Sequence, residues 1–245
     1  MGKVKRLSFI IPVYNEKKNI IPTTEAILST FDKYKEDLEI LFVDDNSPDG
    51  TAEEIESVET KFSQVKLVQH GKKEGIGAAH LFGYENAEGE YILCIDADLS
   101  QDPADLLKMK EKLDKGKDMV IGSRYAIGGE MVGKSILRDV GSRGMNLIAK
   151  VFLGLPTTDT THTFRAFRKS VFNKVSDKIN QKGHPSFQVQ FTFWVRKEGF
   201  DISEIPIRFV ERDDDRGESK LSIKKEIIPF LKIIGNLTLK RFSKA

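Results

Sequence analysis

Short apolar runs alternate along the chain with longer stretches in which apolar residues recur at helical spacing. The apolar runs predict strands at residues 7–12, 39–44, 65–69, 91–95 and 202–210. Helices are predicted over residues 17–33 and 51–62, and from about residue 75 and residue 103 onward. Strands that are apolar throughout and alternate with helices indicate βαβ units and a mainly parallel sheet, an α/β fold.

Polar residues at the helix starts predict where the helices begin. Asn15 is a candidate cap for the first helix, and Asp102, directly before Pro103, is a candidate cap for the fourth. Thr51 and Glu54 have the spacing of a capping box for the second. If Thr51 is the cap, Asp44 and Asp45 are both available to bind a base or a ribose.

Composition narrows the class of protein. Among 245 residues, 39% are hydrophobic and 31% are charged, which is typical of a globular protein and excludes a disordered chain. Cys94 is the single cysteine, so no disulfide forms within the chain, and its apolar surroundings predict a buried thiol in a reducing compartment. The histidines lack metal-ligand spacing, which argues against zinc. The sequence predicts no signal peptide and no transmembrane helix, because its apolar runs are too short.

The fourth strand ends in Asp96-Ala97-Asp98-Leu99-Ser100. Two carboxylates at the end of a buried strand repel each other unless a cation lies near them. Mg²⁺ and Mn²⁺ bind carboxylates and share their remaining positions with water and phosphate oxygens. Solvated acids that cap the next helix are the alternative, but Asp102 serves as that cap more directly. We therefore expect Asp96 and Asp98 to bind a metal and a diphosphate.

Other polar segments also follow strands. Residues 12–16 (P-V-Y-N-E) combine an aromatic ring that can stack on a base with a carboxylate that can accept from a ribose. Ligands bind at the carboxyl ends of parallel strands, so such segments could form a nucleotide site. The glycine-rich stretch 122–133 and the polar run 159–162, which holds two threonines, have the composition of substrate-contacting loops.

Basic residues supply candidates for phosphate binding. Arg124 follows an apolar run, and Arg138, Ser142 and Arg143 lie close to one face of a predicted helix. That face could instead be a solvated helix surface. The charged stretch 211–220 could close over donor phosphates or be an exposed acidic turn.

The C-terminal segment predicts an amphipathic helix. Its apolar positions are Ile223, Ile227, Phe230, Ile234 and Leu237, whereas most of its lysines fall on the other side. Such a helix can lie in a lipid headgroup region or pack on its own domain, and the pattern favours neither.

In this order the motifs resemble family 2 glycosyltransferases of the GT-A (Rossmann-like) fold. The nearest resemblance is to the dolichyl-phosphate mannose synthases and other polyprenyl-phosphate glycosyltransferases, and it spans about residues 7–221. The matching motifs are P-V-Y-N-E at 12–16, D-D at 44–45, D-A-D-L-S at 96–100, G-S-R-Y at 122–125, S-R-G at 142–144, F-R-A-F at 164–167, F-Q at 187–188 and G-E-S-K-L at 217–221.

The resemblance implies a role for each matched residue. Those assigned to the donor nucleoside are Pro12, Tyr14, Glu16, Val43 and Asp45. Those assigned to the donor phosphates and the metal are Asp96, Ala97 and Asp98, with Ser100 in the metal shell directly or through water. Further diphosphate contacts are implied for Arg124, Arg212 and Lys220, and acceptor-phosphate contacts for Arg138 and Ser142. Asp98 and Arg124 are the residues that it implies are catalytic.

The chain departs from the family pattern in three places. Gln190 stands where relatives usually have Glu, His162 and Thr163 replace a common Ser-Gly, and the loop 212–217 is longer and more acidic.

The activity implied by the resemblance is metal-dependent, inverting transfer of a hexose to dolichyl or polyprenyl phosphate, with GDP-mannose preferred as the donor. A transferase using UDP-glucose is the alternative. Transfer to a growing polysaccharide is disfavoured, because Trp194 lacks the Gln-x-x-Arg-Trp context of those enzymes. A non-catalytic nucleotide-sugar or membrane-binding module is the alternative from another class.

The expected organisation is a catalytic domain at residues 1–220 and a C-terminal amphipathic helix at 221–245. Mg²⁺ or Mn²⁺ is the expected cofactor. The expected location is the cytoplasmic face of a membrane, bound peripherally, with a membrane-anchoring partner as one option and no nucleic acid among the partners.

Overall fold

The computed structural model describes residues 6–71, 74–133, 136–180, 186–211 and 223–243. Within these ranges, the helical segments 136–138 and 223–226 are described by their backbone alone.

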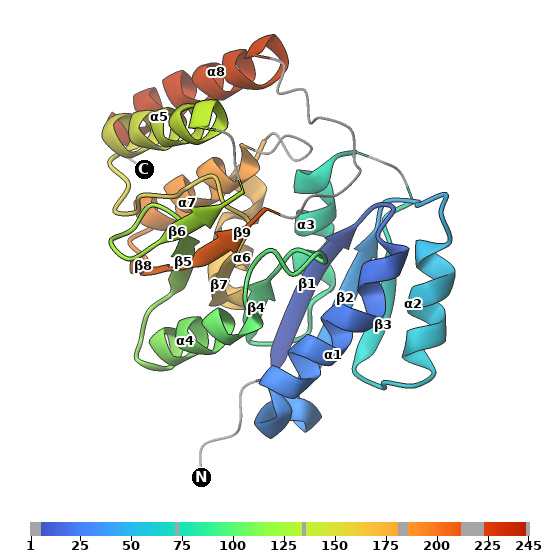
Figure 1. The fold of residues 1–245 in the computed structure, drawn as a ribbon. Helices are drawn as coiled ribbons and strands as arrows, with labels where there is room; N and C mark the ends of the chain where they lie inside the picture. The colour runs from blue at the N-terminus through green and yellow to red at the C-terminus, as the bar shows by residue number, and fades with distance from the viewer. Residues whose placement is uncertain (1–5, 72–73, 134–135, 181–185, 212–222, 244–245) are drawn as a thin grey trace.

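A twisted sheet of seven strands forms the centre of the molecule (Figure 1), in the order β3-β2-β1-β4-β7-β5-β8. All neighbouring pairs are parallel except those made by β7, which runs antiparallel to β4 and to β5. A separate parallel pair joins β6 and β9. The strands are β1 (Leu7–Val13), β2 (Leu38–Asp44), β3 (Val65–Gln69), β4 (Tyr91–Cys94), β5 (Met119–Ser123), β6 (Glu130–Val132), β7 (Arg165–Arg168), β8 (Ile202–Pro206) and β9 (Arg208–Val210).

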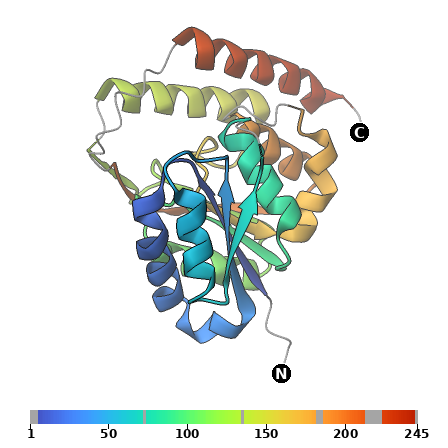
Figure 2. The same cartoon turned by 90° about the vertical axis from the view of Figure 1, so that its right-hand side faces the viewer.

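Helices cover both faces of this sheet, as the two views show (Figures 1 and 2). The buried side chains of α1, α2 and α4 belong to one apolar cluster, and those of α3, α5, α6, α7 and α8 belong to another. The helices are α1 (Ile20–Thr30), α2 (Thr51–Glu59), α3 (Ile76–Asn86), α4 (Pro103–Asp114), α5 (Ile136–Leu153), α6 (Lys169–Val175), α7 (Phe187–Lys197) and α8 (Ile223–Phe242).

The strands are apolar throughout because both of their faces are covered. In β1, Ile10 packs into one apolar cluster, whereas Phe9 and Ile11 pack into the other. All three side chains are fully buried. The mainly parallel α/β arrangement expected from the sequence is confirmed.

Two predicted elements differ from the structure. The strand predicted at 202–210 is divided, because β8 ends at Pro206 beside β5, and β9 then pairs with β6. The helix predicted at 17–33 begins with a 3₁₀ turn at Lys17–Asn19 and becomes α-helical only at Ile20.

The capping predictions have mixed outcomes. Asp102 caps α4, since its carboxylate accepts a hydrogen bond from the amide of Ala104 at 2.8 Å. The capping box at Thr51 was wrong, because Thr51 lies within the first turn of α2 and donates from its amide and its hydroxyl to Asp49, at 3.0 and 2.5 Å. The Thr51 hydroxyl oxygen accepts from the amide of Glu16 instead, at 3.0 Å. Asn15 does not cap the first helix either; it has a left-handed backbone with φ of 60°.

The C-terminal helix α8 packs beside α5 and α7. Phe230, Ile234 and Leu237 of the predicted apolar face are buried in the same cluster as the sheet. For these residues, packing on the domain is therefore the correct interpretation of that face.

Close packing of α3 on the sheet yields the first prediction. A Cβ atom at Gly83 would lie 2.5 Å from Cγ2 of Ile10 and 2.9 Å from Cγ2 of Val43. We expect Gly83→Ala to lower the free energy of unfolding, measured by denaturant titration, by about 1–3 kcal/mol through overpacking. Gly141→Ala is the matched control, because no atom of the described residues lies within 4 Å of its added Cβ. The control should raise the free energy of unfolding by up to about 1 kcal/mol, and equal stability of both variants would contradict the packing described here.

Candidate active site

Polar side chains gather at the carboxyl ends of β1, β2, β4 and β5. These four strands run in the same direction, so the residues that follow them meet at one edge of the sheet. Tyr14, Asp45, Asp96 and Arg124 lie directly after, or within two residues of, the ends of these strands. This edge brings together most of the site residues expected from the sequence.

A cavity of about 240 Å³ opens beside the ends of β1 and β2. Four residues expected to bind the donor nucleoside line it, together with Val13 and the start of α3. The lining residues are Pro12, Val13, Tyr14, Glu16, Asp45, Gly75, Ile76 and Ala79. An aromatic ring, two carboxylates and an apolar wall suit a nucleoside. The contribution of α3 was not anticipated, because an apolar helix start carries no distinguishing sequence signal.

Asp44, the last residue of β2, and Asp45, which follows it, have different roles. Oδ1 of Asp45 lies 2.8 Å from Nδ1 of His70, whose ring packs against Phe82. Asp44 instead closes the turn, because its carboxylate accepts from the amide and the hydroxyl of Ser47, at 3.1 and 2.5 Å. The expectation that both acids are available was therefore wrong for Asp44, and Asp45 alone lines the cavity.

Two expected contact residues lie inside the protein. Val43 is fully buried and packs in the core of the sheet. Ala97 is also buried, and its carbonyl accepts a hydrogen bond from the hydroxyl of Thr23. Neither side chain lines the cavity, so any contact of Ala97 with a donor would involve its backbone.

The acids after β4 lie in a tight turn. Leu99 has a left-handed backbone with φ of 54°, and the Asp98 carboxylate accepts from the amide of Ser100 at 2.9 Å. Asp96 accepts from Nε2 of Gln101 at 2.7 Å and from the hydroxyl of Thr163 at 3.3 Å. Burial and the charge of Asp98 together raise the pKa of Asp96 to about 6, although these hydrogen bonds act to lower it. The two carboxylates therefore interact unfavourably, as expected of a pair that binds a cation.

The residues of this turn fit a divalent metal. Two carboxylates are hard oxygen ligands, and the Ser100 hydroxyl is buried without a hydrogen-bond partner among the described residues. In the described part of the chain, no group of three or more His, Cys, Asp and Glu side chains could hold a metal ion. The protein would therefore leave coordination positions for water and for phosphate oxygens.

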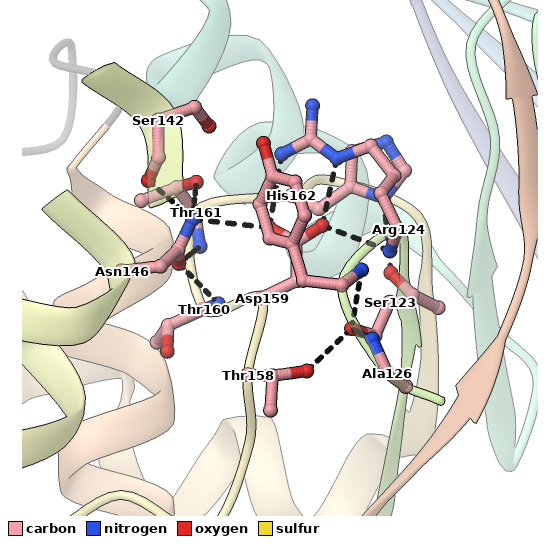
Figure 3. Close-up of polar contacts among 12 residues, drawn as sticks. Ser123, Arg124, Ala126, Ser142, Asn146, Thr158, Asp159, Thr160, Thr161 and His162 are labelled. Atoms are coloured by element: carbon pink, nitrogen blue, oxygen red, sulfur yellow. Dashed lines mark hydrogen bonds and ion pairs between the residues drawn. The ribbon is translucent and has the colours of Figure 1, made fainter. Parts of the chain in front are cut away.

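Arg124 follows β5 and is held by a buried acid, Asp159 (Figure 3). Its Nε and Nη2 donate to the two carboxylate oxygens of Asp159 at 2.7 and 2.9 Å. Burial opposes the charge of both groups, yet their pairing prevails: the pKa of Arg124 is raised and that of Asp159 is lowered. The charge of Asp96 also raises the pKa of Arg124, so the arginine and the acid pair share one electrostatic environment.

The loop that carries Asp159 connects the elements around the site. The Thr158 and Ser123 hydroxyls form a hydrogen bond of 2.7 Å with each other. The Ser123 hydroxyl oxygen also accepts from the amides of Tyr125 and Ala126. Asn146 of α5 accepts from the amide of Thr160 at 2.7 Å (Figure 3). The sequence marked residues 159–162 as a polar run, but it assigned no role to Asp159 or Asn146.

The expected acceptor and loop residues lie partly outside the described side chains. Ser142 is half-buried on α5. Arg138 belongs to the same helix, but its side chain is not described, and Arg212 and Lys220 lie outside the described residues. Arg143 is half exposed and pairs with Asp139 at 2.8 Å.

Of the residues that depart from the family pattern, His162 and Gln190 are buried and Thr163 is partly buried, whereas the loop 212–217 lies outside the described residues. Nδ1 of His162 donates to the carbonyl of Gly122 at 3.1 Å, and burial, together with the charge of Arg124, lowers the pKa of its ring to about 3. Its ring is therefore neutral. Thr163 contacts Asp96, as described above, and the Gln190 side chain accepts from the amide of Asn180 at 3.2 Å.

Comparison with known proteins agrees with this geometry. Residues 8–176 match the family described as Glycosyl transferase family 2. The chain is 34% identical over 225 residues to a polyprenol monophosphomannose synthase of Mycolicibacterium smegmatis, covering 89% of this chain and 82% of that protein. It is 37% identical over 221 residues to an undecaprenyl-phosphate mannosyltransferase of Micrococcus luteus, covering 89% and 88%.

Solved structures share the fold at low sequence identity. A mannosyltransferase from Pyrobaculum calidifontis, in complex with GDP-Man and Mn²⁺, aligns with a TM-score of 0.66 at 18% identity, covering 100% of this chain and 66% of that one. Glucosyl-3-phosphoglycerate synthase from Mycobacterium tuberculosis, with Mn²⁺, UDP-glucose and phosphoglyceric acid, aligns with a TM-score of 0.64 at 14% identity, covering 95% and 80%. With its GT-A fold and the matched residues 8–176, the chain belongs to glycosyl transferase family 2.

Proposed function

We propose that this glycosyltransferase transfers mannose from GDP-mannose to a polyprenyl phosphate, with inversion at the anomeric carbon and with a divalent metal. The relatives at 34 and 37% identity are named for mannosyl transfer to polyprenyl phosphates. A mannosyltransferase of the same fold was solved with GDP-Man and Mn²⁺.

One observation carries the proposal: a partly buried acid pair, an arginine and a nucleoside-sized cavity share one edge of the sheet. Asp96 and Asp98 follow β4, the cavity opens beside β1, and β1 pairs directly with β4. A nucleoside in the cavity would extend its diphosphate toward the acids and Arg124. This order of parts matches the order of groups in a nucleotide sugar.

Asp96 and Asp98 would hold Mg²⁺ or Mn²⁺, with Ser100 bound directly or through water. The metal, when bound, neutralises charge on the leaving diphosphate. Solved relatives of this fold contain Mn²⁺, which supports a divalent metal without deciding between the two ions.

The chain itself would contribute position and charge. Nη1 of Arg124 makes no hydrogen bond among the described residues, so the guanidinium can donate to a donor phosphate while Asp159 holds its other side. Arg212 and Lys220 are proposed to add charge there, and Arg138 and Ser142 to hold the acceptor phosphate. An acceptor phosphate oxygen attacks the anomeric carbon, the sugar–phosphate C–O bond breaks, and its electron pair leaves with the nucleoside diphosphate. The acceptor is already anionic, so no strong general base is needed.

The acceptor would place the enzyme at a membrane, and two helices offer a surface for it. Val140, Leu147 and Val151 of α5 recur at helical spacing on its exposed side, as do Ile228, Leu231, Leu239 and Phe242 on α8. These seven side chains are between 46 and 77% exposed, and α5 and α8 lie side by side in both views (Figures 1 and 2). We call these seven residues the outward apolar face.

Charge complementarity favours an anionic bilayer as the occupant of this face. Among the described side chains of α5 and α8, the acid Asp139 is paired with Arg143, whereas the cations are Arg143, Lys150, Lys232, Lys240 and Arg241. A neighbouring cavity of about 420 Å³ is lined by Arg196, Lys197 and Arg241. Exposed apolar side chains flanked by cations are typical of peripheral membrane binding. We therefore propose peripheral binding, at the cytoplasmic face.

Among the described helices, none combines the length and the apolar character that crossing a bilayer requires.

The function is tested by the purified protein with labelled GDP-mannose or UDP-glucose, dolichyl or undecaprenyl phosphate, and Mn²⁺ or Mg²⁺. We expect organic-phase label from GDP-mannose, and its loss on addition of EDTA. Label from UDP-glucose alone would identify a glucosyltransferase. No label from any combination would leave the non-catalytic module as the better description.

The acid pair yields a second test. We expect Asp98→Asn to reduce mannosyl transfer by at least about 100-fold, because one of two charges that hold the metal and the diphosphate is removed. Calorimetry should show weakened Mn²⁺ binding in the presence of GDP. Asp102→Asn is the matched control: it makes the same chemical change four residues away, where Asn caps α4 as well as Asp does. Activity of Asp98→Asn near that of the control would refute the metal role.

The outward apolar face is tested by sedimentation with vesicles of phosphatidylglycerol and phosphatidylcholine. We expect Leu147→Glu combined with Leu239→Glu to weaken vesicle binding at least about tenfold, since two apolar side chains no longer enter the interface. Ile127→Glu is the matched control, because Ile127 is fully exposed and lies outside both helices. Transfer to a short-chain, water-soluble polyprenyl phosphate should be unchanged in all variants. Unchanged vesicle binding by the double variant would assign the face to an anchoring protein or a second copy instead.

A further inference from the structure

The side chain of Asn146 on α5 is hydrogen-bonded to the loop that holds Arg124. Oδ1 of Asn146 accepts from the amides of Thr160 and Thr161 at 2.7 and 3.2 Å. Its Nδ2 donates to the Thr161 hydroxyl at 3.1 Å and, more weakly, to Asp159 at 3.4 Å. Asn146 is 2% exposed, so these contacts are shielded from water. Figure 3 shows this network and the ion pair of Arg124 as one connected set.

Asp159, which directly precedes Thr160 in the same loop, determines where Arg124 points. Asp159 grips the guanidinium with two short hydrogen bonds and also accepts from the Arg124 amide at 3.2 Å. Fork-to-fork pairing of this kind fixes the plane of the guanidinium as well as its position. Asp159 therefore holds the guanidinium in place independently of α5.

Asn146 also lies on the part of α5 that carries the proposed acceptor site. Position 142 lies one helical turn before Asn146, and position 138 lies two turns before it. Nδ2 of Asn146 donates to the backbone carbonyl of Ser142 at 3.1 Å. The ring of Tyr125 adds a second connection, because Cζ of Arg124 and Cζ of Arg143 lie 5.1 and 4.5 Å from its centroid.

We propose that Asn146 is a positioning residue that holds the acceptor-bearing part of α5 at a fixed distance from Arg124, an inference that rests on the proposed function. In-line attack requires the acceptor oxygen and the donor anomeric carbon to meet in one geometry, and a displacement of about 1 Å can cost about 100-fold in rate. Asn146 and Asp159 connect the two binding sites without contacting either substrate.

Asparagine is suited to this position because the loop requires both a donor and an acceptor. Its amide oxygen accepts from two backbone amides, and its amide nitrogen donates to Thr161 and Asp159. Aspartate would lose the donor and bring a second carboxylate beside Asp159. Leucine would leave the Thr160 and Thr161 amides without an acceptor.

The test compares Asn146→Ala with a destabilised control on the same helix, Leu153→Ala, which removes buried apolar volume seven residues further along α5. We expect Asn146→Ala to lower kcat/KM for transfer to polyprenyl phosphate by about tenfold or more. The Kd for GDP with Mn²⁺, measured by calorimetry, should stay within twofold of the wild type. Leu153→Ala should lower Tm by as much or more without this loss of kcat/KM.

A milder variant covers the case in which Asn146→Ala does not fold. Thr161→Val removes the hydroxyl that accepts from Asn146 and keeps the side-chain shape, so it should show a smaller loss of transfer in the same direction. Slow hydrolysis of GDP-mannose by water, which needs no acceptor site, should be unchanged in both variants. A fall in hydrolysis equal to the fall in transfer, or equal kinetics of Asn146→Ala and Leu153→Ala, would overturn the positioning role. Failure of the proposed function itself would be distinct, because the wild type would then transfer no sugar.

Discussion

Buried charge at the carboxyl edge of the sheet is the constraint on which the rest of the site depends. Arg124 and Asp159 neutralise each other inside the protein, with two hydrogen bonds that compensate for the loss of water. Asp159 therefore balances most of the positive charge of Arg124, which compensates the negative charges of Asp96 and Asp98 only in part. Burial raises the pKa of Asp96, and the charge of Asp98 adds to this effect more than Arg124 offsets it. An edge with excess negative charge attracts a divalent cation, and the cation in turn makes the edge able to receive a diphosphate.

The same constraint explains the composition of the loop around Asp159. A buried ion pair requires polar neighbours that satisfy its remaining hydrogen-bonding groups, and short hydroxyl side chains do so in little space. Thr160 and Thr161 contribute backbone amides to Asn146, and Thr163 reaches Asp96. The neutral ring of His162 adds no charge beside Arg124. The threonine-rich run is thus a structural requirement of the charges that it surrounds.

Sequence patterns predicted the candidate site residues that directly follow strands, and missed those that are positioned by contacts across the chain. Asp96, Asp98 and Arg124 each follow an apolar run, so the strand-end rule located them. Asp159 pairs with Arg124 across 35 residues, and Asn146 lies on a helix between them, so no spacing connects the three. The acids after β2 show a finer limit. Two adjacent carboxylates cannot both face the cavity, and only the turn at Ser47 decides that Asp45 does.

The C-terminal helix shows a similar limit of periodicity. Spacing identified an apolar face that includes Phe230, Ile234 and Leu237, and these side chains are indeed buried. The helix also has a second apolar side, exposed at Leu239 and Phe242. A periodicity that assumes one apolar face and one polar face does not predict a second apolar side. Only the packing of α8 on α5 and α7 shows that they face outward.

The two sides of α5 connect the proposed membrane surface with the chemistry. Leu147 faces outward on this helix, whereas Asn146, the preceding residue, is buried against the loop of Asp159. A helix that is docked on a bilayer through one side and hydrogen-bonded to the loop of Asp159 through the other has little freedom to tilt. The lipid phosphate of an acceptor lies at the level of the headgroups, which is the depth at which such a helix would bind. The bilayer would then fix the acceptor in depth, Asn146 would fix α5 relative to Arg124, and the reacting atoms would be aligned without a general base.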